Sequence, residues 1–180
     1  MVSFLRPRSA ELAVGVAYRL IGGGRGGPGG MPRGAPNPSE EKKEGIFVQR
    51  FQTLSNRFSE NNGVFLCHIG PDHWLLRAPL NREAALNAQL KPADAPADIS
   101  VVRISDTQTF FRITGPEVAE VISIGCPMDV HKTAFPLNGV SFSEFFTVKA
   151  LILRNTSGFD VAIEQSYANM IADYLNRATA

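Results

Sequence analysis

The residue types best suited to chemistry gather between positions 126 and 131, where Cys126, Asp129 and His131 lie within six positions. Thiolate, carboxylate and imidazole groups serve as metal ligands and as parts of hydrolytic sites. A structural zinc takes four ligands, so this triplet is incomplete. Cys126 also follows the predicted end of a helix, where the helix dipole favours a cation over a thiolate. We therefore predict no catalytic residue and no metal site in this chain.

The remaining thiol and imidazole groups are Cys67, His68 and His73. Alternation along a strand points Cys67 and His68 to opposite faces, which argues against a shared metal. A domain of this size folds without covalent cross-links, so two buried free thiols are favoured over a Cys67–Cys126 disulfide. Free thiols fit a reducing compartment, and we expect a cytoplasmic protein.

The run Gly22-Gly23-Gly24-Arg25-Gly26-Gly27 matches the dinucleotide-binding pattern G-x-G-x-x-G. That pattern binds a pyrophosphate only where a strand enters the loop and a helix leaves it. Here a helix is predicted before the run, and a tract rich in proline and glycine follows it. We interpret residues 22–34, with eight glycines in thirteen positions, as a linker or an extended arm.

The overall composition indicates one compact domain with a tail. Of the 180 residues, 44% are hydrophobic and 19% are charged, which is enough apolar material for a core. The net charge of +1 gives no electrostatic case for nucleic acid. No apolar run approaches the roughly 18 residues that a membrane span requires. We therefore expect neither nucleic-acid binding nor a membrane span.

The pattern before residue 45 differs from the rest. Residues 9–21 have apolar positions near helical spacing, and Ser9 could cap a helix there. We accordingly divide the chain into residues 1–44, an N-terminal helix with a glycine- and proline-rich arm, and residues 45–180, a single α+β domain. Residues 46–51 fit either a first strand or the start of a short helix.

Within the domain, hairpins alternate with single helices. The predicted strands cover residues 64–69, 73–78, 99–104, 107–114, 144–154 and 158–164, and residues 70–72 form the first turn. The predicted helices cover residues 82–90, capped by Asn81, residues 117–124, ended by Gly125 in a left-handed conformation, and residues 167–177, capped by Ser166. This order predicts an α+β fold with antiparallel sheets covered by helices on one side.

Two pairs of adjacent phenylalanines, at positions 110–111 and 145–146, fall in predicted strands. One ring of each pair should face the core and the other should face outward, where it needs cover from this domain's own helices or from another chain. The candidate subunit-interface residues are therefore Phe110, Phe145 and Phe146, together with Arg25 and Arg33 of the basic arm.

Several short motifs resemble one family in the same order along the chain. They are residues 70–76 (GPDHWLL), residues 111–116 (FRITGP), residues 125–131 (GCPMDVH) with Phe135-Pro136, and Ser166-Tyr167-Ala168 leading to Tyr174-Leu175. Together they span residues 63 to 178 and resemble the sarcosine oxidase gamma subunit family. Gln165 stands where that family usually has arginine and Thr114 where it often has serine, and the glycine-rich arm is unusual. These departures leave the particular N-methyl amine open.

The resemblance implies a fold similar to the folate-binding domain of aminomethyltransferases. It also implies a non-catalytic, structural subunit of a heterotetrameric, flavin-dependent N-methyl amino acid oxidase or dehydrogenase. Its partners would be the alpha, beta and delta subunits of that complex. FAD, FMN and NAD would bind the alpha and beta subunits, and zinc would bind the delta subunit. Tetrahydrofolate would bind the alpha subunit and receive the one-carbon unit there. No cofactor is expected in this chain.

Two other functions remain open from the residues alone. A stand-alone folate-binding or one-carbon transfer protein would need a carboxylate for the pterin ring, for which Glu120 and Glu144 are conceivable, and a pocket of several hundred Å³. A small adaptor could use its basic arm to contact RNA or lipid phosphates.

Overall fold

The computed structural model describes residues 3–4, 15–22, 55–95 and 99–178. In chain order the strands are β1 (Ser3–Phe4), β2 (Gly15–Gly22), β3 (Phe58–Asn61), β4 (Val64–Gly70), β5 (His73–Pro79), β6 (Ile99–Arg103), β7 (Gln108–Thr114), β8 (Val140–Phe145), β9 (Val148–Arg154) and β10 (Gly158–Glu164). The α-helices are α2 (Glu83–Gln89), α3 (Val118–Gly125) and α4 (Ala168–Ala178). The short 3-10 helices are η1 (Leu80–Arg82), η2 (Pro92–Asp94), η3 (Ser105–Thr107) and η4 (Gln165–Tyr167).

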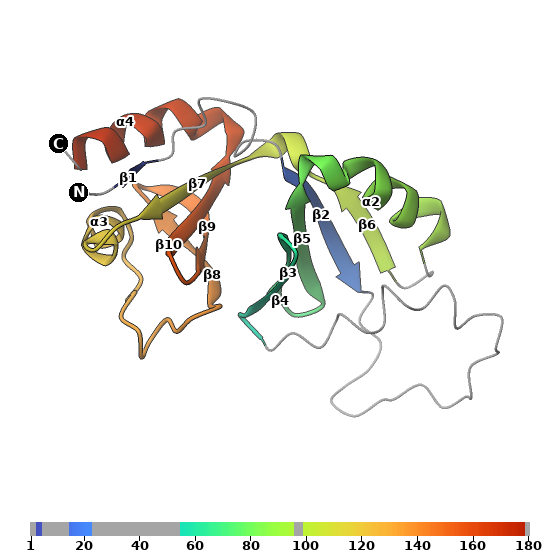
Figure 1. Ribbon diagram of the computed structural model, residues 1–180, viewed down its shortest axis with the longest axis horizontal. Coiled ribbons are helices and arrows are strands. Elements are labelled where there is room, and N and C mark those ends of the chain that lie inside the picture. The colour runs from blue at the N-terminus through green and yellow to red at the C-terminus, as the bar shows by residue number, and fades with distance from the viewer. Residues whose placement is uncertain (1–2, 5–14, 23–54, 96–98, 179–180) are drawn as a thin grey trace.

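The strands form two antiparallel sheets. Sheet A has the order β1-β7-β10-β9-β8, and sheet B has the order β3-β4-β5-β2-β6. Figure 1 shows sheet A with α3 and α4 in one half of the molecule and sheet B with α2 in the other half. This arrangement confirms the predicted α+β class with antiparallel sheets and covering helices.

The inner faces of the two sheets share one hydrophobic core. Leu75 and Cys67 from sheet B pack there with Phe110, Leu151 and Ala162 from sheet A. Strand β10 lies in the middle of sheet A, and its first six residues are all buried. Burial on both faces explains why β10 reads as an almost continuous apolar run rather than as an alternating pattern.

Each outer sheet face has a core of its own under helices. Ile122 of α3 and Ile171 and Leu175 of α4 pack with Phe111 and Val161 on sheet A. Leu86 of α2 and Leu90 at its C-terminal end cover the outer face of sheet B. They pack on residues of four strands: Tyr18, Leu20, Leu66, Leu76 and Val101. The fold therefore has four layers in the order helix, sheet, sheet, helix.

The two halves have the same strand topology. In sheet A the meander β8-β9-β10 pairs through β10 with β7, and β1 forms the far edge. In sheet B the meander β3-β4-β5 pairs through β5 with β2, and β6 forms the far edge. Each edge strand leads along the chain into the other sheet, β1 to β2 and β6 to β7. The similar element patterns of the two sequence halves therefore reflect two equivalent sheets that exchange their edge strands.

The N-terminal helix predicted for residues 9–21 is wrong over its second half, because residues 15–22 form strand β2. This strand lies between β5 and β6, and both Ala17 and Tyr18 are buried, so adjacent residues are apolar as they would be in a buried helix. Residues 5–14 and the 44/45 domain boundary lie outside the described residues, and the division at that boundary stays a prediction. So does the element predicted at 46–51.

The long strand predicted for residues 144–154 is two strands, β8 and β9, joined by a tight hairpin. Phe146 and Thr147 form the turn with φ values of 47° and 69°. Turns of this kind usually carry glycine, asparagine or aspartate, which tolerate positive φ. Phenylalanine and threonine give no such signal, so the sequence concealed the turn.

The other predicted elements are confirmed, with three corrections at helix ends. Ser166 lies within η4 and its hydroxyl donates to the Glu164 carboxylate at 2.9 Å, so the Ser166 cap is wrong. The β4–β5 hairpin turns at residues 70–72, where Asp72 has a φ of 52°. Helix α2 begins after Arg82 without a side-chain cap, so the Asn81 cap is wrong. Helix α3 ends at Gly125, but Cys126 follows with a φ of −118°, and Gly125 has no positive φ. The left-handed cap is therefore also wrong.

Candidate subunit interface

Two of the predicted interface phenylalanines are covered by this chain itself. Phe110 is 6% exposed in the core between the sheets, where the Arg77 guanidinium lies 4.2 Å from its ring centroid. Phe145 is fully buried under the helices of sheet A. Sheet B covers the ring of Phe110, and the helices of sheet A cover the ring of Phe145, so neither ring faces outward. Phe110 and Phe145 are core residues, and their assignment to an interface was wrong.

Phe146 lies nearer the surface. Its ring stacks on Tyr174 of α4 with centroids 5.0 Å apart, and its backbone N–H donates to the Gly125 carbonyl at 2.8 Å. The side chain is partly buried and packs against the outer core of sheet A. Arg25 and Arg33, the other two predicted interface residues, lie outside the described residues.

Exposed apolar side chains lie on the two helices that Phe146 contacts, α3 and α4, and on η4 just before α4. Tyr167, Met170 and Tyr174 recur at positions i, i+3 and i+7 through η4 and α4, and each is at least 37% exposed. Ile124 at the end of α3 is 62% exposed. We name these four residues and Phe146 the α3–α4 patch. The helical spacing that buries Ile171 and Leu175 also exposes these three residues of η4 and α4, which the sequence analysis did not single out.

Gly125 is small because Phe146 needs the space beside it. A Cβ atom on Gly125 would lie 2.9 Å from two atoms of the Phe146 ring. We expect Gly125→Val to displace this ring and to lower the free energy of unfolding by about 1–3 kcal/mol, as overpacking does. Urea denaturation checks this result. Gly70→Ala is the control, since its nearest neighbours would lie 3.8 Å away; equal stability of the two variants would contradict the packing explanation.

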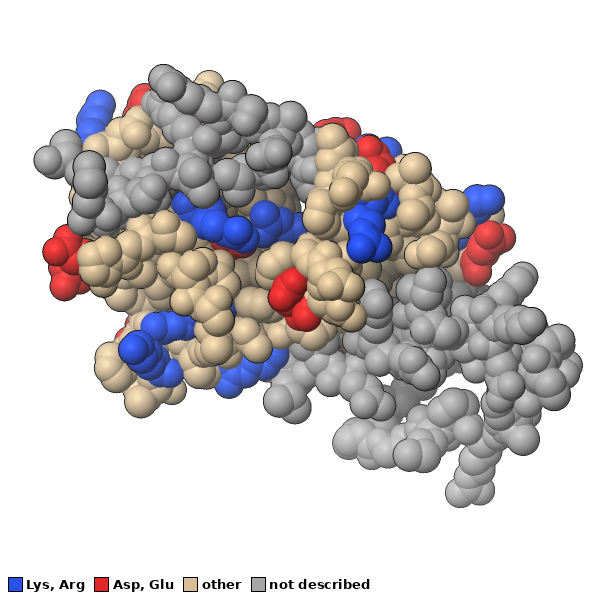
Figure 2. Space-filling model, in the orientation of Figure 1, with Lys and Arg blue, Asp and Glu red and all other residues tan. Residues whose placement is uncertain are grey.

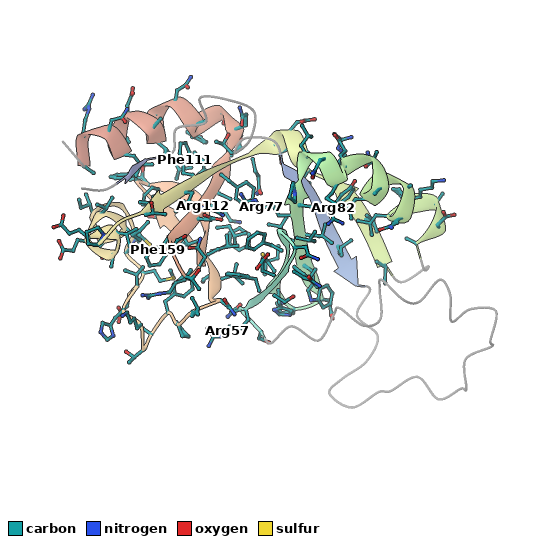
Figure 3. All side chains as sticks on the ribbon, viewed as in Figure 1. Arg57, Arg77, Arg82, Phe111, Arg112 and Phe159 are labelled. Atoms are coloured by element: carbon teal, nitrogen blue, oxygen red, sulfur yellow. The ribbon has the colours of Figure 1, made fainter. Side chains whose placement is uncertain are left out.

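A group of charged residues joins the two sheets. Arg112 on β7 donates from Nε and Nη2 to the two carboxylate oxygens of Asp160 on β10, at 2.7 and 2.8 Å. Arg77 on β5 of sheet B donates from Nη1 to Asp160 at 2.8 Å. Asn155 donates from Nδ2 to the same carboxylate at 3.2 Å. We name Arg77, Arg112, Asn155 and Asp160 the inter-sheet cluster. Figure 3 shows Arg77 and Arg112 side by side where the two halves meet.

The electrostatics of the inter-sheet cluster keep Asp160 charged. Burial alone raises the pKa of this carboxyl, but the hydrogen bonds and charges of Arg112 and Arg77 outweigh it and hold the pKa below its ordinary value. The hydrogen bond to Asp160 correspondingly raises the pKa of Arg112. The cluster therefore links the sheets through charge-assisted hydrogen bonds that persist at neutral pH.

The residues considered for chemistry make local structural contacts. Asp129 Oδ1 accepts a hydrogen bond from the His131 backbone at 2.8 Å, and His131 Nδ1 lies 2.8 Å from Thr133 Oγ1. Both cysteines are buried free thiols, as predicted. Burial raises the pKa of Cys67 to about 12, so it is protonated at neutral pH. Among the described residues no three His, Cys, Asp or Glu side chains are grouped as metal ligands would be.

The inner layer opens at the end of the sheets away from the inter-sheet cluster. Two adjoining hollows of about 700 and 360 Å³ share five lining residues: Thr107, Gln108, Phe142, Lys149 and Leu151. The Lys149 ammonium lies 4.8 Å from the centroid of the Phe142 ring. Of the two folate carboxylate candidates, Glu120 lines a separate hollow of about 540 Å³ beside α3, and Glu144 pairs in register with Lys149 at the edge of sheet A. The structure does not bring them together.

The fold defines a class of protein: two packed antiparallel sheets with outer helices, as in the glycine cleavage system aminomethyltransferase T from Bartonella henselae. That structure has 13% identity and a TM-score of 0.60, with 92% of this chain and 44% of the other covered. A second similar structure is the heterotetrameric sarcosine oxidase from Corynebacterium sp. U-96 in complex with pyrrole 2-carboxylate. Its matching chain has 20% identity and a TM-score of 0.72, with 98% of this chain and 83% of that chain covered.

A family model assigns the chain more closely. The sarcosine oxidase gamma subunit family model matches residues 56–180, which is more than half of the sequence. The chain belongs to the sarcosine oxidase gamma subunit family, as its ordered motifs indicated. A search of curated protein sequences finds no match. Within the described residues, no helix has the length and apolar character needed to cross a membrane.

Proposed function

We propose that this chain is a non-catalytic structural subunit of a heterotetrameric N-methyl amino acid oxidase or dehydrogenase of the sarcosine oxidase type. The family match over residues 56–180 is the observation that carries the proposal. The likeness to a chain of a heterotetrameric sarcosine oxidase over 98% of this chain agrees with it. In the complex, this chain would supply surface and shape, and its partners would supply the reacting groups.

The chemistry of the described residues supports a role without catalysis. The buried ion cluster bridges two sheets, Cys67 is a protonated core thiol, and His131 is engaged in a local turn. Asp129 and His131 line the hollow beside α3, where their hydrogen bonds to the His131 backbone and to Thr133 hold a turn. We propose that FAD, FMN and NAD bind the alpha and beta subunits, that zinc binds the delta subunit, and that tetrahydrofolate receives the one-carbon unit at the alpha subunit. Such a complex would operate in the cytoplasm.

The α3–α4 patch supports assembly with larger chains. Exposed aromatic and methionine side chains that adjoin one another usually mark protein contacts. Phe146 and Tyr174 supply two stacked rings there, and Met170 lies one helical turn from Tyr174. In this proposal, Phe146 remains an interface residue, and Arg25 and Arg33 remain interface candidates outside the described part of the chain.

Affinity purification tests the proposed assembly. We expect the tagged full-length chain, expressed in its native host, to retain three other chains and the visible absorbance of flavin. In this proposal the flavin binds the partner chains, so the colour would come from them. A chain that purifies alone, and that runs as a stable monomer at physiological concentration, would contradict the proposal.

The stand-alone folate function makes a different prediction in solution. A folate-binding protein would give heat and a fluorescence change when tetrahydrofolate is titrated into the isolated chain. A subunit whose partner binds folate would give neither. Calorimetry on the purified full-length chain therefore separates the two functions, and saturable binding would favour the stand-alone protein.

A further inference from the structure

The inter-sheet cluster has more positive than negative charge. It contains two guanidinium cations, Arg77 and Arg112, and one carboxylate, Asp160. The Asp160 oxygens accept four hydrogen bonds, two from Arg112, one from Arg77 and one from Asn155. A carboxylate offers about four acceptor positions, so Asp160 has no capacity left. Among the described residues, Asp160 is the only carboxylate paired with either arginine, which leaves one positive charge without a counterpart.

The unmatched charge faces outward. The Asp160 side chain is 1% exposed, whereas the Arg77 and Arg112 side chains are 12% and 32% exposed. In Figure 2, basic side chains gather on this face near the middle of the molecule, where Figure 3 labels Arg77 and Arg112 in the same orientation. A cation that is partly removed from water is costly unless an anion approaches it.

Arg112 also retains the means to bind such an anion. Its Nε and Nη2 atoms are directed at Asp160, and Nη1 makes no hydrogen bond to a described residue. A guanidinium has five N–H donors in one plane, so the outer edge of Arg112 can still donate to a second carboxylate. The contacts with Asp160 fix the plane of the group in advance, which lowers the entropy lost on binding.

We propose that Arg112, held in place by Asp160, is the docking point for an aspartate or glutamate side chain of a partner subunit. The partner carboxylate would complete a cluster of two arginines and two carboxylates where sheets A and B meet. The three hollows described above do not include Arg112 in their lining. A small free anion would therefore be held weakly at this exposed guanidinium, whereas a carboxylate fixed on a protein surface is positioned by the rest of the interface. This inference rests on the proposed function.

The test measures the affinity of this chain for its partner subunits at several salt concentrations. Arg112→Gln removes the outer charge but leaves Arg77 paired with Asp160, so no buried carboxylate loses its cation. We expect the variant chain to bind its partners about ten-fold or more weakly and its affinity to depend less on salt than that of the wild type. Arg82→Gln is the matched control, an exposed arginine on η1 outside the cluster, and it should bind as the wild type does.

Each outcome decides one question. If the wild-type chain fails to bind any partner, the proposed function is wrong. If the wild type binds and Arg112→Gln binds equally well with the same salt dependence, the docking point is wrong and the proposed function stands. If Arg112→Gln does not fold, Arg112→Lys decides, because lysine keeps the charge and loses the planar set of guanidinium donors. Weaker binding at an unchanged melting temperature supports the docking point. Wild-type affinity overturns it. If acetate raises the melting temperature of the chain and Arg112→Gln still assembles as the wild type does, the site binds a small anion. That result would also overturn the docking point.

Discussion

Asp160→Ala should lower the free energy of unfolding by about 3–5 kcal/mol, because removing one member of a buried ion pair leaves its partners unpaired. Arg77 is the residue most affected, since its side chain is 12% exposed and bridges from sheet B to Asp160 on sheet A. Arg112 would lose both of its hydrogen bonds to the carboxylate. Urea denaturation monitored by circular dichroism measures the change.

A second ion pair provides the control. Arg103 and Glu83 also form a salt bridge, but their side chains are 47% and 27% exposed. Glu83→Ala should therefore cost less than about 1 kcal/mol. If the two substitutions had equal effects, burial would not be what gives Asp160 its importance, and the account of the inter-sheet cluster would be wrong.

The same carboxylate makes a prediction about acid. The pKa of Asp160 is lower in the folded chain than its ordinary value, so folding is stabilised when this group is ionised. That contribution is complete above the unfolded pKa of about 3.9 and is lost as the pH falls through the folded pKa. We expect wild-type stability to fall below about pH 4 and Asp160→Asn to lose part of this dependence. Melting temperatures across the acid range check this result; identical profiles would contradict it.

Phe111→Ala should lower the free energy of unfolding by about 3–5 kcal/mol through the lost ring and the cavity left behind. Phe111 is 7% exposed on β7, in the core that α3 and α4 cover. It is adjacent to Phe110, which points to the opposite face, into the core between the sheets. A substitution at Phe111 therefore tests the strand register as well as the packing.

Phe142→Ala is the matched control for this prediction. Phe142 lies on the edge strand β8 and is 42% exposed, so its loss should cost under about 1 kcal/mol. Chemical denaturation of both variants gives the comparison. A loss under about 1 kcal/mol at Phe111 would mean that its ring is not in the core, and the description of β7 would then fail.

Local signals in the sequence predicted most elements from residue 64 onward, although they missed the β8–β9 turn. Pro71 and Asp72 mark the β4–β5 turn, and Ile171 and Leu175 mark the buried stripe of α4. These features depend on residues within one or two turns of each other. The prediction for strand β2 failed because Ala17 and Tyr18 are buried on opposite faces of an inner strand. The resulting apolar run has the same pattern as a buried helix.

The inter-sheet cluster could not be predicted from spacing. Arg77 and Arg112 lie 83 and 48 positions from Asp160, and only the pairing of β7 with β10 and the packing of the sheets bring them together. One signal was present, an aspartate in the otherwise apolar stretch between Phe159 and Ile163 of β10. A charge in such a strand indicates a buried partner of opposite sign. The exposed apolar residues Tyr167, Met170 and Tyr174 were likewise recognisable in the sequence from their helical spacing.

Reconstituted turnover tests the central claim most directly. The full-length chain, the remaining subunits and their mixture would each be assayed for oxidation of sarcosine and other N-methyl amino acids. We predict no turnover by this chain alone, and a mixture that is more active or longer-lived than the remaining subunits without it. Oxidation of an N-methyl amine by the isolated chain, or partner subunits that are equally active and stable in its absence, would contradict a structural role.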